Sequence, residues 1–264
     1  MLSVESLSKT FFPKTVDEVL ALRGLDLHLQ TGDVVSVIGS NGAGKSTLLN
    51  AIAGMFPCER GRIVVDGSEV TRQPEHRRAR LIARVTQDPK QGTAPAMSIE
   101  EHLAMANLRG GRRGLGRGVT DRQREQFRTA LAELEIGLEN RMKAPVGTLS
   151  GGQRQALALV MAGINRPALL LLDEHTANLD PKTGKRILDL TQRVISEHKL
   201  TTLMVTHNMD HAIRYGNRLI MMHQGQIVLD IRGDDKLTLS VHDLIARFES
   251  QAGARFLDDR VLLN

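Results

Sequence analysis

Residues 39–46 (GSNGAGKS) are the part of the chain whose residue types and spacing most clearly predict chemistry. They fit the pattern GxxxxGK[ST] and lie between an apolar run at 33–38 and a segment with helical periodicity at 44–53. Glycines allow successive backbone N–H groups to turn inward around phosphate oxygens, and the following helix adds its positive dipole end. Lys45 can place a charge on the β- and γ-phosphates, and Ser46 can offer a hydroxyl to Mg²⁺. This segment therefore predicts a nucleotide site.

Two adjacent carboxylates, Asp173 and Glu174, follow the fully apolar run at 168–172. A carboxylate at the C-terminal edge of a strand, beside a phosphate loop, is suited to bind Mg²⁺. Adjacent residues on a strand point in opposite directions. We therefore expect Asp173 to face the metal and Glu174 to face the attacking water as general base. A solvated acidic turn is the alternative interpretation.

Two further polar residues follow predicted strands. His207 comes after the strand predicted at 201–206, where an imidazole could sense the γ-phosphate. Gln87 comes after the strand predicted at 82–85, where its amide oxygen could bind Mg²⁺ or the attacking water. Each has a simpler alternative, because a lone histidine after a strand is usually structural and a lone glutamine is usually a surface residue.

Composition limits the class of protein. The chain has 264 residues, which suits one large domain or a domain with a subdomain. Its single cysteine, Cys58, excludes an internal disulfide and suits a reducing compartment. The sequence shows neither an apolar run of about 18 residues nor a secretory signal, so we expect a cytoplasmic protein. The net charge of +5 favours anionic neighbours, although a moderately basic solvated surface explains it as well.

Strands alternate with helices along most of the chain, which predicts an α/β fold with a mainly parallel sheet covered on both faces. The expected strands are 33–38, 61–67, 82–85, 168–172 and 201–206, followed by a hairpin of 219–223 with 226–230 around Gln224-Gly225. The expected helices are 44–53, 99–108, 121–136, 150–164, 182–197, 208–214 and 240–248. We expect a core of residues 1–87 and 151–232, a mostly helical subdomain at 88–150, and a helical C-terminal tail at 233–264.

The pentapeptide LSGGQ at 149–153 narrows the function. With it, the chain resembles the ATP-binding-cassette (ABC) ATPases over nearly its full length, because six motifs stand in that family's order and spacing. They are Phe11 after Lys9-Thr10, the phosphate loop, Gln87, LSGGQ, the run LLLLDE that ends in Asp173 and Glu174, and His207. The resemblance implies a P-loop NTPase with an N-terminal antiparallel β portion and an inserted α-helical subdomain. It also implies hydrolysis of ATP with Mg²⁺.

The resemblance also implies an active site built from two chains. Two copies would face each other head to tail, with each ATP between Lys45 of one chain and LSGGQ of the other. Phe11 corresponds to the aromatic residue that stacks on adenine, where tyrosine is commoner, and the neighbouring Phe12 could take that role instead. The catalytic residues would be Glu174, His207, Lys45 and Gln87, and the metal ligands would be Ser46, Gln87 and Asp173. The nucleotide-binding residues would be Phe11, Gly39, Ser40, Asn41, Gly42, Ala43, Gly44, Lys45, Ser46, Thr47, Ser150, Gly151, Gly152, Gln153 and Asp180.

A narrower likeness concerns residues 87–95, the Gly/Arg loop at 109–118, and residues 173–177 and 202–209. These are similar to ATPases of tryptophan/tyrosine or amino-acid importers, which share His175 and work with a membrane permease and a substrate-binding lipoprotein. The resemblance implies a peripheral place on the cytoplasmic face of the membrane. Two alternatives stay open, a cluster-assembly ATPase without a permease and an exporter ATPase. Co-purification with membrane subunits would indicate an importer, and co-purification with a soluble scaffold would indicate a cluster-assembly ATPase.

The arginines at 109–128 suggest a nucleic-acid partner. Few aromatic residues accompany them, so no such partner is expected.

Overall fold

The computed structural model describes residues 1–111 and 118–252, so part of the Gly/Arg loop and most of the tail at 251–264 lie outside the described residues. The chain forms two compact units. We call Met1–Arg78 with Thr201–Asn264 the terminal unit, and Ala79–Leu200 the central unit. The finer divisions expected at 88–150 and 233–264 stay predictions.

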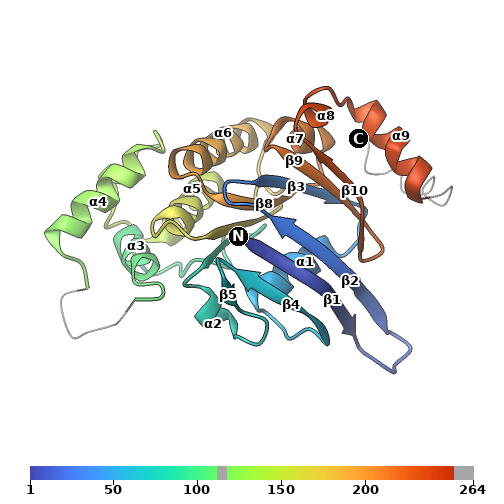
Figure 1. The fold of residues 1–264 in the computed structure, drawn as a ribbon. Helices are drawn as coiled ribbons and strands as arrows, with labels where there is room; N and C mark the ends of the chain where they lie inside the picture. Colours follow the sequence, from blue (N-terminus) through green and yellow to red (C-terminus); the bar gives the residue numbers. More distant parts are fainter. Residues whose placement is uncertain (112–117, 253–264) are drawn as a thin grey trace. The chain divides into compact units, whose positions relative to one another are not determined.

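The terminal unit contains an antiparallel sheet with the strand order β2-β1-β4-β5 (Figure 1). Alternate residues of its first strand, such as Leu2 and Val4, are buried while Glu5 is exposed, as expected for a sheet with one face on the core. The sheet confirms the antiparallel β portion expected near the N-terminus. Its strands are β1 (Leu2–Phe11), β2 (Val19–Leu29), β4 (Arg60–Val65) and β5 (Ser68–Glu69).

A second set of strands in the terminal unit has the order β10-β9-β3-β8. β3 runs parallel to both of its neighbours, and β10 is antiparallel to β9. Gln224 and Gly225 both take positive φ values, 46° and 80°, in the two-residue turn between β9 and β10. This confirms the predicted hairpin, because such turns match the twist of the strands. The strands are β3 (Val34–Gly39), β8 (Thr201–Val205), β9 (Arg218–His223) and β10 (Gln226–Arg232).

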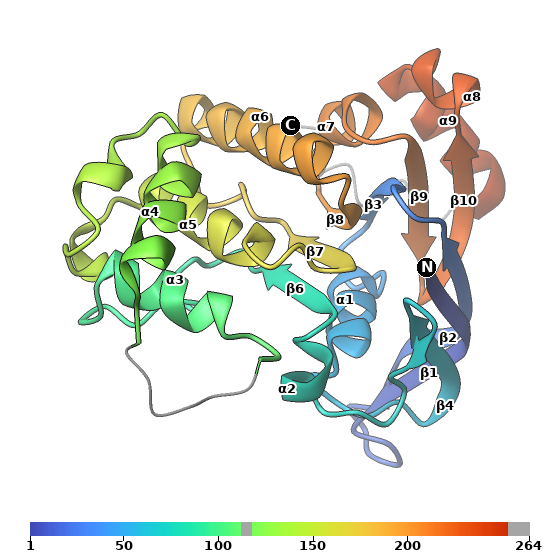
Figure 2. The same ribbon diagram turned by 60° about the vertical axis from the view of Figure 1, so that its left-hand side comes forward.

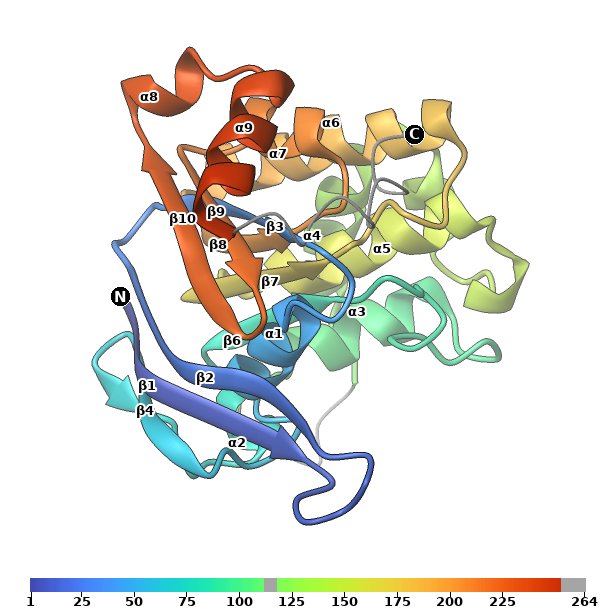
Figure 3. The same ribbon diagram turned by 90° about the vertical axis from the view of Figure 1, so that its right-hand side faces the viewer.

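The helices of the terminal unit match the predicted ones, and two short helices add to them. α1 ends at Ala53, as expected, because the next residue, Gly54, has a φ of 85° that stops the helix. α9 buries Leu244 and Phe248 in one cluster with Leu229 of β10 (Figure 3). Four-residue helices are too short to give a periodic signal, so α2 and α8 were not expected. The helices are α1 (Lys45–Ala53), α2 (Glu75–Arg78), α7 (Met209–Arg214), α8 (Asp234–Leu237) and α9 (Val241–Ala252).

The central unit pairs two parallel strands, β6 (Ile82–Val85) and β7 (Leu169–Asp173), with helices (Figure 2). β7 is buried along its whole length, as its unbroken apolar run predicted. α4 ends at Ala132, so the helix expected at 121–136 is too long there; the positive φ of Glu135, 54°, ends the helical path. The helices are α3 (Ile99–Asn107), α4 (Asp121–Ala132), α5 (Gly151–Gly163) and α6 (Pro181–His198), with 3₁₀ turns η1 (Leu138–Asn140) and η2 (Val146–Thr148).

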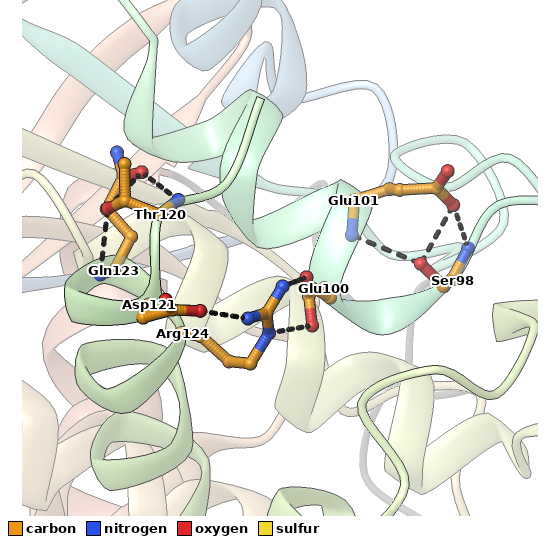
Figure 4. Close-up of polar contacts among 7 residues, drawn as sticks. All are labelled: Ser98, Glu100, Glu101, Thr120, Asp121, Gln123 and Arg124. Carbon is orange, nitrogen blue, oxygen red and sulfur yellow. Dashed lines mark hydrogen bonds and ion pairs between the residues drawn. The ribbon is translucent and has the colours of Figure 1, made fainter. Parts of the chain in front are cut away.

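Polar contacts fix the beginnings of α3 and α4 in the central unit (Figure 4). Each helix begins with a capping box, Ser98 with Glu101 and Thr120 with Gln123. The guanidinium of Arg124 on α4 donates two hydrogen bonds to Glu100 on α3, at 2.8 and 3.0 Å. A bidentate pair of this kind is directional, so it sets the two helices relative to each other.

None of the helices in residues 1–111 and 118–252 combines the length and the apolar character that crossing a bilayer requires.

A buried lysine holds α8 to the end of α7 in the terminal unit. Lys236 is only 2% exposed, and its ammonium group donates hydrogen bonds to the carbonyl oxygens of Tyr215 at 2.6 Å and Gly216 at 2.7 Å. Burial disfavours the charged form and lowers the pKa of Lys236 to about 8.

The free energy of unfolding should therefore depend on pH through this residue. Between pH 8 and about 10.4, folded Lys236 has lost its proton while the unfolded chain keeps it. Because the unfolded state then binds more protons, the contribution of Lys236 to stability rises with pH. Across this range, the free energy of unfolding of wild type relative to that of Lys236→Met should increase by on the order of 1 to 3 kcal/mol, measured by urea unfolding. Lys185→Met, at an exposed position of α6, is the control. A constant difference between wild type and Lys236→Met would contradict the prediction.

Candidate functional site

The predicted phosphate loop leaves β3 at Gly39 and enters α1 at Lys45. Two glycines are required by the backbone. Gly39 has φ 147°, and a Cβ there would overlap the carbonyl oxygen of Met222. Gly44 has φ 97°, and a Cβ there would lie 2.5 Å from the carbonyl oxygen of Ala21. Any side chain at either position would displace the loop from β2 and β9, so the glycines fix its path.

The N-terminus of α1 differs from those of most other helices. α3, α4, α5, α6 and α7 each begin with a side chain that accepts a hydrogen bond from their own first turn. α1 begins at Gly44, which has no side-chain oxygen to accept one. α1 thus lacks the side-chain cap that α3 to α7 have, and the dipole of the helix favours an anion there.

Lys45 reaches back along the loop. It is 7% exposed, and its ammonium group donates hydrogen bonds to the carbonyl oxygens of Gly39 at 2.7 Å and Ser40 at 2.9 Å. Asn41, Gly42 and Ser46 are exposed on the outside of the same loop. The loop thus brings a buried cation, exposed glycine backbone and a hydroxyl into one short segment, which fits the triphosphate chain of a nucleotide.

Two other predicted residues lie in the terminal unit. Phe11 is the last residue of β1, and its ring contacts that of Phe56, with centroids 5.2 Å apart. His207 is exposed and follows β8, whose Val205 pairs with Val37 of β3. Parallel strands end at the same edge of a sheet, so the phosphate loop and His207 emerge together. Thr47 is half-buried in the first turn of α1.

Asp173 is the last residue of β7 and Glu174 comes next, while Gln87 follows β6; in these parallel strands of the central unit Val85 pairs with Leu172. Gln87 is exposed. Glu174 leaves the extended conformation with φ 43° and begins a turn in which Ala177 N–H donates to its carbonyl oxygen. The direction of Glu174 is therefore set by this turn, and the strand alternation that we assumed does not apply to it. A left-handed non-glycine residue is strained, and such strain concentrates at functional sites.

Asp173 has a partner that the sequence analysis missed. The Nη2 atom of Arg84 on β6 donates to Asp173 Oδ2 at 2.9 Å, and both side chains are largely buried. The available signal was an arginine inside a short apolar strand, since a charge buried there needs an opposite charge. The neighbouring His175 is also buried, and its Nε2 lies 3.1 Å from Thr191 Oγ1 of α6.

The LSGGQ segment forms the beginning of α5, as expected. Ser150 is the N-cap: its Oγ accepts from Gln153 N–H at 3.3 Å, and Gln153 Oε1 accepts from Ser150 N–H at 3.1 Å. This capping box uses the oxygen of the Ser150 hydroxyl and leaves its hydrogen available to donate. The side chain of Gln153 therefore caps the helix.

A second helix begins next to α5. Gly152 lies against Thr183 on α6, and a Cβ on Gly151 would be 3.7 Å from Leu179 Cδ2. Asp180 caps α6 by accepting from Thr183 N–H at 3.0 Å, and the hydrogen bonds from Thr183 lower the pKa of Asp180. Ser150, Gly151 and Asp180 are exposed. The N-termini of α5 and α6 therefore lie side by side. The carboxylate of Asp180 already compensates the dipole of α6, so the N-terminus of α5 is the one suited to an external anion.

The predicted site residues thus form two sets, each within one unit. The terminal unit holds Phe11, residues 39–47 and His207, and the central unit holds Gln87, residues 150–153, Asp173, Glu174 and Asp180. Each set contains oxygen donors of the kind that Mg²⁺ prefers, the Ser46 hydroxyl in the first and the Asp173 carboxylate in the second. Each donor is of a kind that can bind a nucleotide-bound magnesium ion, since such an ion makes its further bonds to phosphates.

Comparison with known proteins agrees with this chemistry. The family model described as "ABC transporter" matches residues 22–177. The chain belongs to the ABC transporter family. It is 40% identical to the tyrosine transport ATP-binding protein of Clostridioides difficile (strain R20291), over 94% of this chain and 99% of that protein. It is 35% identical to the lipoprotein-releasing system ATP-binding protein LolD of Ruegeria sp. (strain TM1040), over 86% and 97%.

A solved structure shows the same fold. The dimeric post-hydrolysis state of the ATP-binding cassette MJ0796, bound to ADP and phosphate, has a TM-score of 0.75 and 26% identity, covering 88% of this chain and 98% of that one. The ABC chain described here is accordingly an ATPase with the P-loop NTPase fold, and its nucleotide is ATP. These comparisons leave the assignment of individual site residues as a prediction.

The packing of Gly152 on Thr183 gives a test of how α5 and α6 are joined. Gly152→Ala should lower the free energy of unfolding by about 1 to 3 kcal/mol, because the new methyl overlaps Thr183 Cγ2. Thr183→Ser removes that Cγ2 methyl and keeps the residue's hydroxyl and N–H. The double variant Gly152→Ala with Thr183→Ser should therefore regain most of the lost free energy of unfolding, measured by urea unfolding. If the double variant is as unstable as Gly152→Ala, the contact is not the cause.

Proposed function

We propose that this ABC ATPase is the nucleotide-binding subunit of an importer and that two copies close around two ATP molecules. The observation that carries the proposal is the exposed N-terminus of α5 at Ser150 and Gly151. It offers a hydroxyl donor, backbone N–H groups and a helix dipole for an anion, in the same chain that has its own phosphate loop. A head-to-tail pair of identical chains lets each loop meet this N-terminus of the other chain, with two-fold symmetry.

The chemical roles follow from residue type. Lys45 binds the β- and γ-phosphates, and Phe11 stacks on the base. Ser46, Gln87 and Asp173 would hold the Mg²⁺, which when bound neutralises charge on the phosphates. Glu174 takes the proton of the attacking water as general base, and His207 stabilises charge on the transferred phosphoryl group. The Ser150 hydroxyl and the backbone of Gly151 and Gly152 donate to the γ-phosphate of the opposite chain.

The partners are inferred from the family and its relatives. We infer that the dimer binds a separate membrane permease at the cytoplasmic face of the membrane, and that a substrate-binding lipoprotein supplies the solute. The relative that covers 94% of the chain is named for tyrosine transport, which supports an amino acid or a similar small solute. The LolD relative belongs to a lipoprotein-releasing system, so an exporter is the second candidate function. Loss of γ-phosphate contacts on hydrolysis opens the dimer, because only the closed state gains from them.

Replacing the general base should separate binding from hydrolysis. Glu174→Gln should bind ATP with nearly unchanged affinity while phosphate release falls about 100-fold or more, because the amide cannot accept the proton of water. A dimer should accumulate with ATP and Mg²⁺ in light-scattering chromatography. Glu197→Gln, at an exposed position of α6, is the matched control. Hydrolysis by Glu174→Gln at the wild-type rate would remove Glu174 from this role.

A mixing experiment tests whether the active site is shared between chains. Lys45→Ala and Ser150→Arg should each be inactive alone, because each damages both sites of a homodimer. A mixed dimer contains one intact site, formed by Lys45 of the Ser150→Arg chain and Ser150 of the Lys45→Ala chain. Mixing the two variants should therefore restore part of the ATPase activity. No recovery in a mixture that forms heterodimers would contradict the shared site.

A further inference from the structure

The terminal unit carries a half-buried aromatic pair at the end of β1. The rings of Phe11 and Phe56 meet edge to face, with an angle of 82° between their planes. Aromatic residues are only 3% of this sequence, so such a pair is unusual for the chain. An edge-to-face contact restricts the orientation of both rings. The loop that follows α1 therefore constrains the ring that we expect to stack on the base.

A lysine lies beside both rings. Lys9 is 9% exposed, and its Nζ is 5.3 Å from the centroid of each ring, within the range of a cation–π contact. The same ammonium group donates to the carbonyl oxygen of Pro57 at 2.9 Å and to Glu59 Oε1 at 2.7 Å. Lys9 thus joins the strand that carries Phe11 to the loop that carries Phe56.

Glu59 completes the connection. Its Oε2 accepts from Thr10 N–H at 2.9 Å, and its own N–H donates to the carbonyl oxygen of Ser8 at 3.2 Å. The residues on either side of Lys9 are therefore bound to one carboxyl residue, which fixes the backbone just before Phe11. We call Lys9, Phe56 and Glu59 the ring support.

Phe12 has no comparable support. Its side chain is 66% exposed, and its φ of 50° places it in the turn that leaves β1, where Thr15 Oγ1 donates to its carbonyl oxygen at 2.7 Å. An exposed side chain keeps more of its rotamer freedom, and that freedom would be lost on stacking. The two neighbouring phenylalanines are therefore unequal, and the structure favours Phe11.

We propose that Lys9, Phe56 and Glu59 are positioning residues that hold the Phe11 ring ready for the purine base of a nucleoside triphosphate. The inference rests on the proposed role of Phe11 in ATP binding. The ring support lies on the base side of the nucleotide, and its contacts are with β1 and with the loop after α1. It sets the affinity for the base and leaves the affinity of the loop at 39–47 for phosphates unchanged.

Inorganic tripolyphosphate is the probe that separates these two contributions, because it has the phosphates of ATP and no base. Dissociation constants for ATP and for tripolyphosphate should be measured by calorimetry on the full chain. The variants are Phe56→Leu, which keeps apolar volume without a ring, and Lys9→Met, which keeps the stem without the charge. Each should weaken ATP binding by about twofold to tenfold and change tripolyphosphate binding by less than about twofold.

Two reference variants make the outcomes distinguishable. Phe11→Leu should weaken the binding of ATP and leave the binding of tripolyphosphate unchanged. Phe12→Leu should change neither dissociation constant. If Phe11→Leu acts as expected while Phe56→Leu and Lys9→Met bind ATP normally, the positioning role proposed for the ring support is wrong and the proposed base site stands. If Phe11→Leu has no selective effect, or Phe12→Leu has it instead, the proposed base site is itself wrong. If Phe56→Leu binds both ATP and tripolyphosphate more weakly and to the same degree, the variant has a general structural defect, and this result would overturn the inference.

Discussion

The uncapped N-terminus of α1 is the constraint on which the rest of the site depends. A helix leaves its first N–H groups without partners inside the helix, and α3 to α7 each satisfy one of them with a side-chain cap. Gly44 cannot do so, and its left-handed backbone is kept by close packing against Ala21. The dipole at this N-terminus is therefore not offset by a capping side chain, which favours an external anion. The sheets of the terminal unit hold this N-terminus in place, since the loop is confined by β2 and β9.

In the central unit, unlike at α1, the helix N-termini have side-chain caps. Ser150 caps α5 and Asp180 caps α6, and both residues are exposed where the two helices begin side by side. A hydroxyl can accept from its own helix and still donate its hydrogen outward, whereas a carboxylate can only accept. The serine of LSGGQ is thus suited to stabilise its own helix and to contact a phosphate of another chain. Capping and ligand binding use different atoms of one side chain.

Much of this arrangement could be predicted from the sequence. The run 168–172 has no polar residue for five positions, which specifies a buried strand with its carboxylates at the end. The turn at Gln224-Gly225 could be predicted because few residue types, glycine above all, readily adopt the positive φ values that such a two-residue turn requires. Other features depend on tertiary contacts. The positive φ of Glu174 has no local pattern in the sequence. The arginine inside the apolar strand β6 indicates that Arg84 needs an opposite charge, but its pairing with Asp173 depends on the neighbouring strand β7. The capping boxes of α3, α4 and α5 share a sequence pattern, Ser or Thr followed three residues later by Glu or Gln, so these contacts could be foreseen at the level of single atoms.

The charged groups of the site have partners within the protein itself. Lys45 donates to two carbonyl oxygens of its own loop, and Asp173 accepts from Arg84. A buried charge without such partners would cost several kcal/mol, so these contacts stabilise the folded chain. Binding of a phosphate or of a cation then exchanges one set of partners for another, and the net gain is smaller than the new contacts alone suggest. In the proposed dimer, small differences in this exchange of partners would decide which state the γ-phosphate favours.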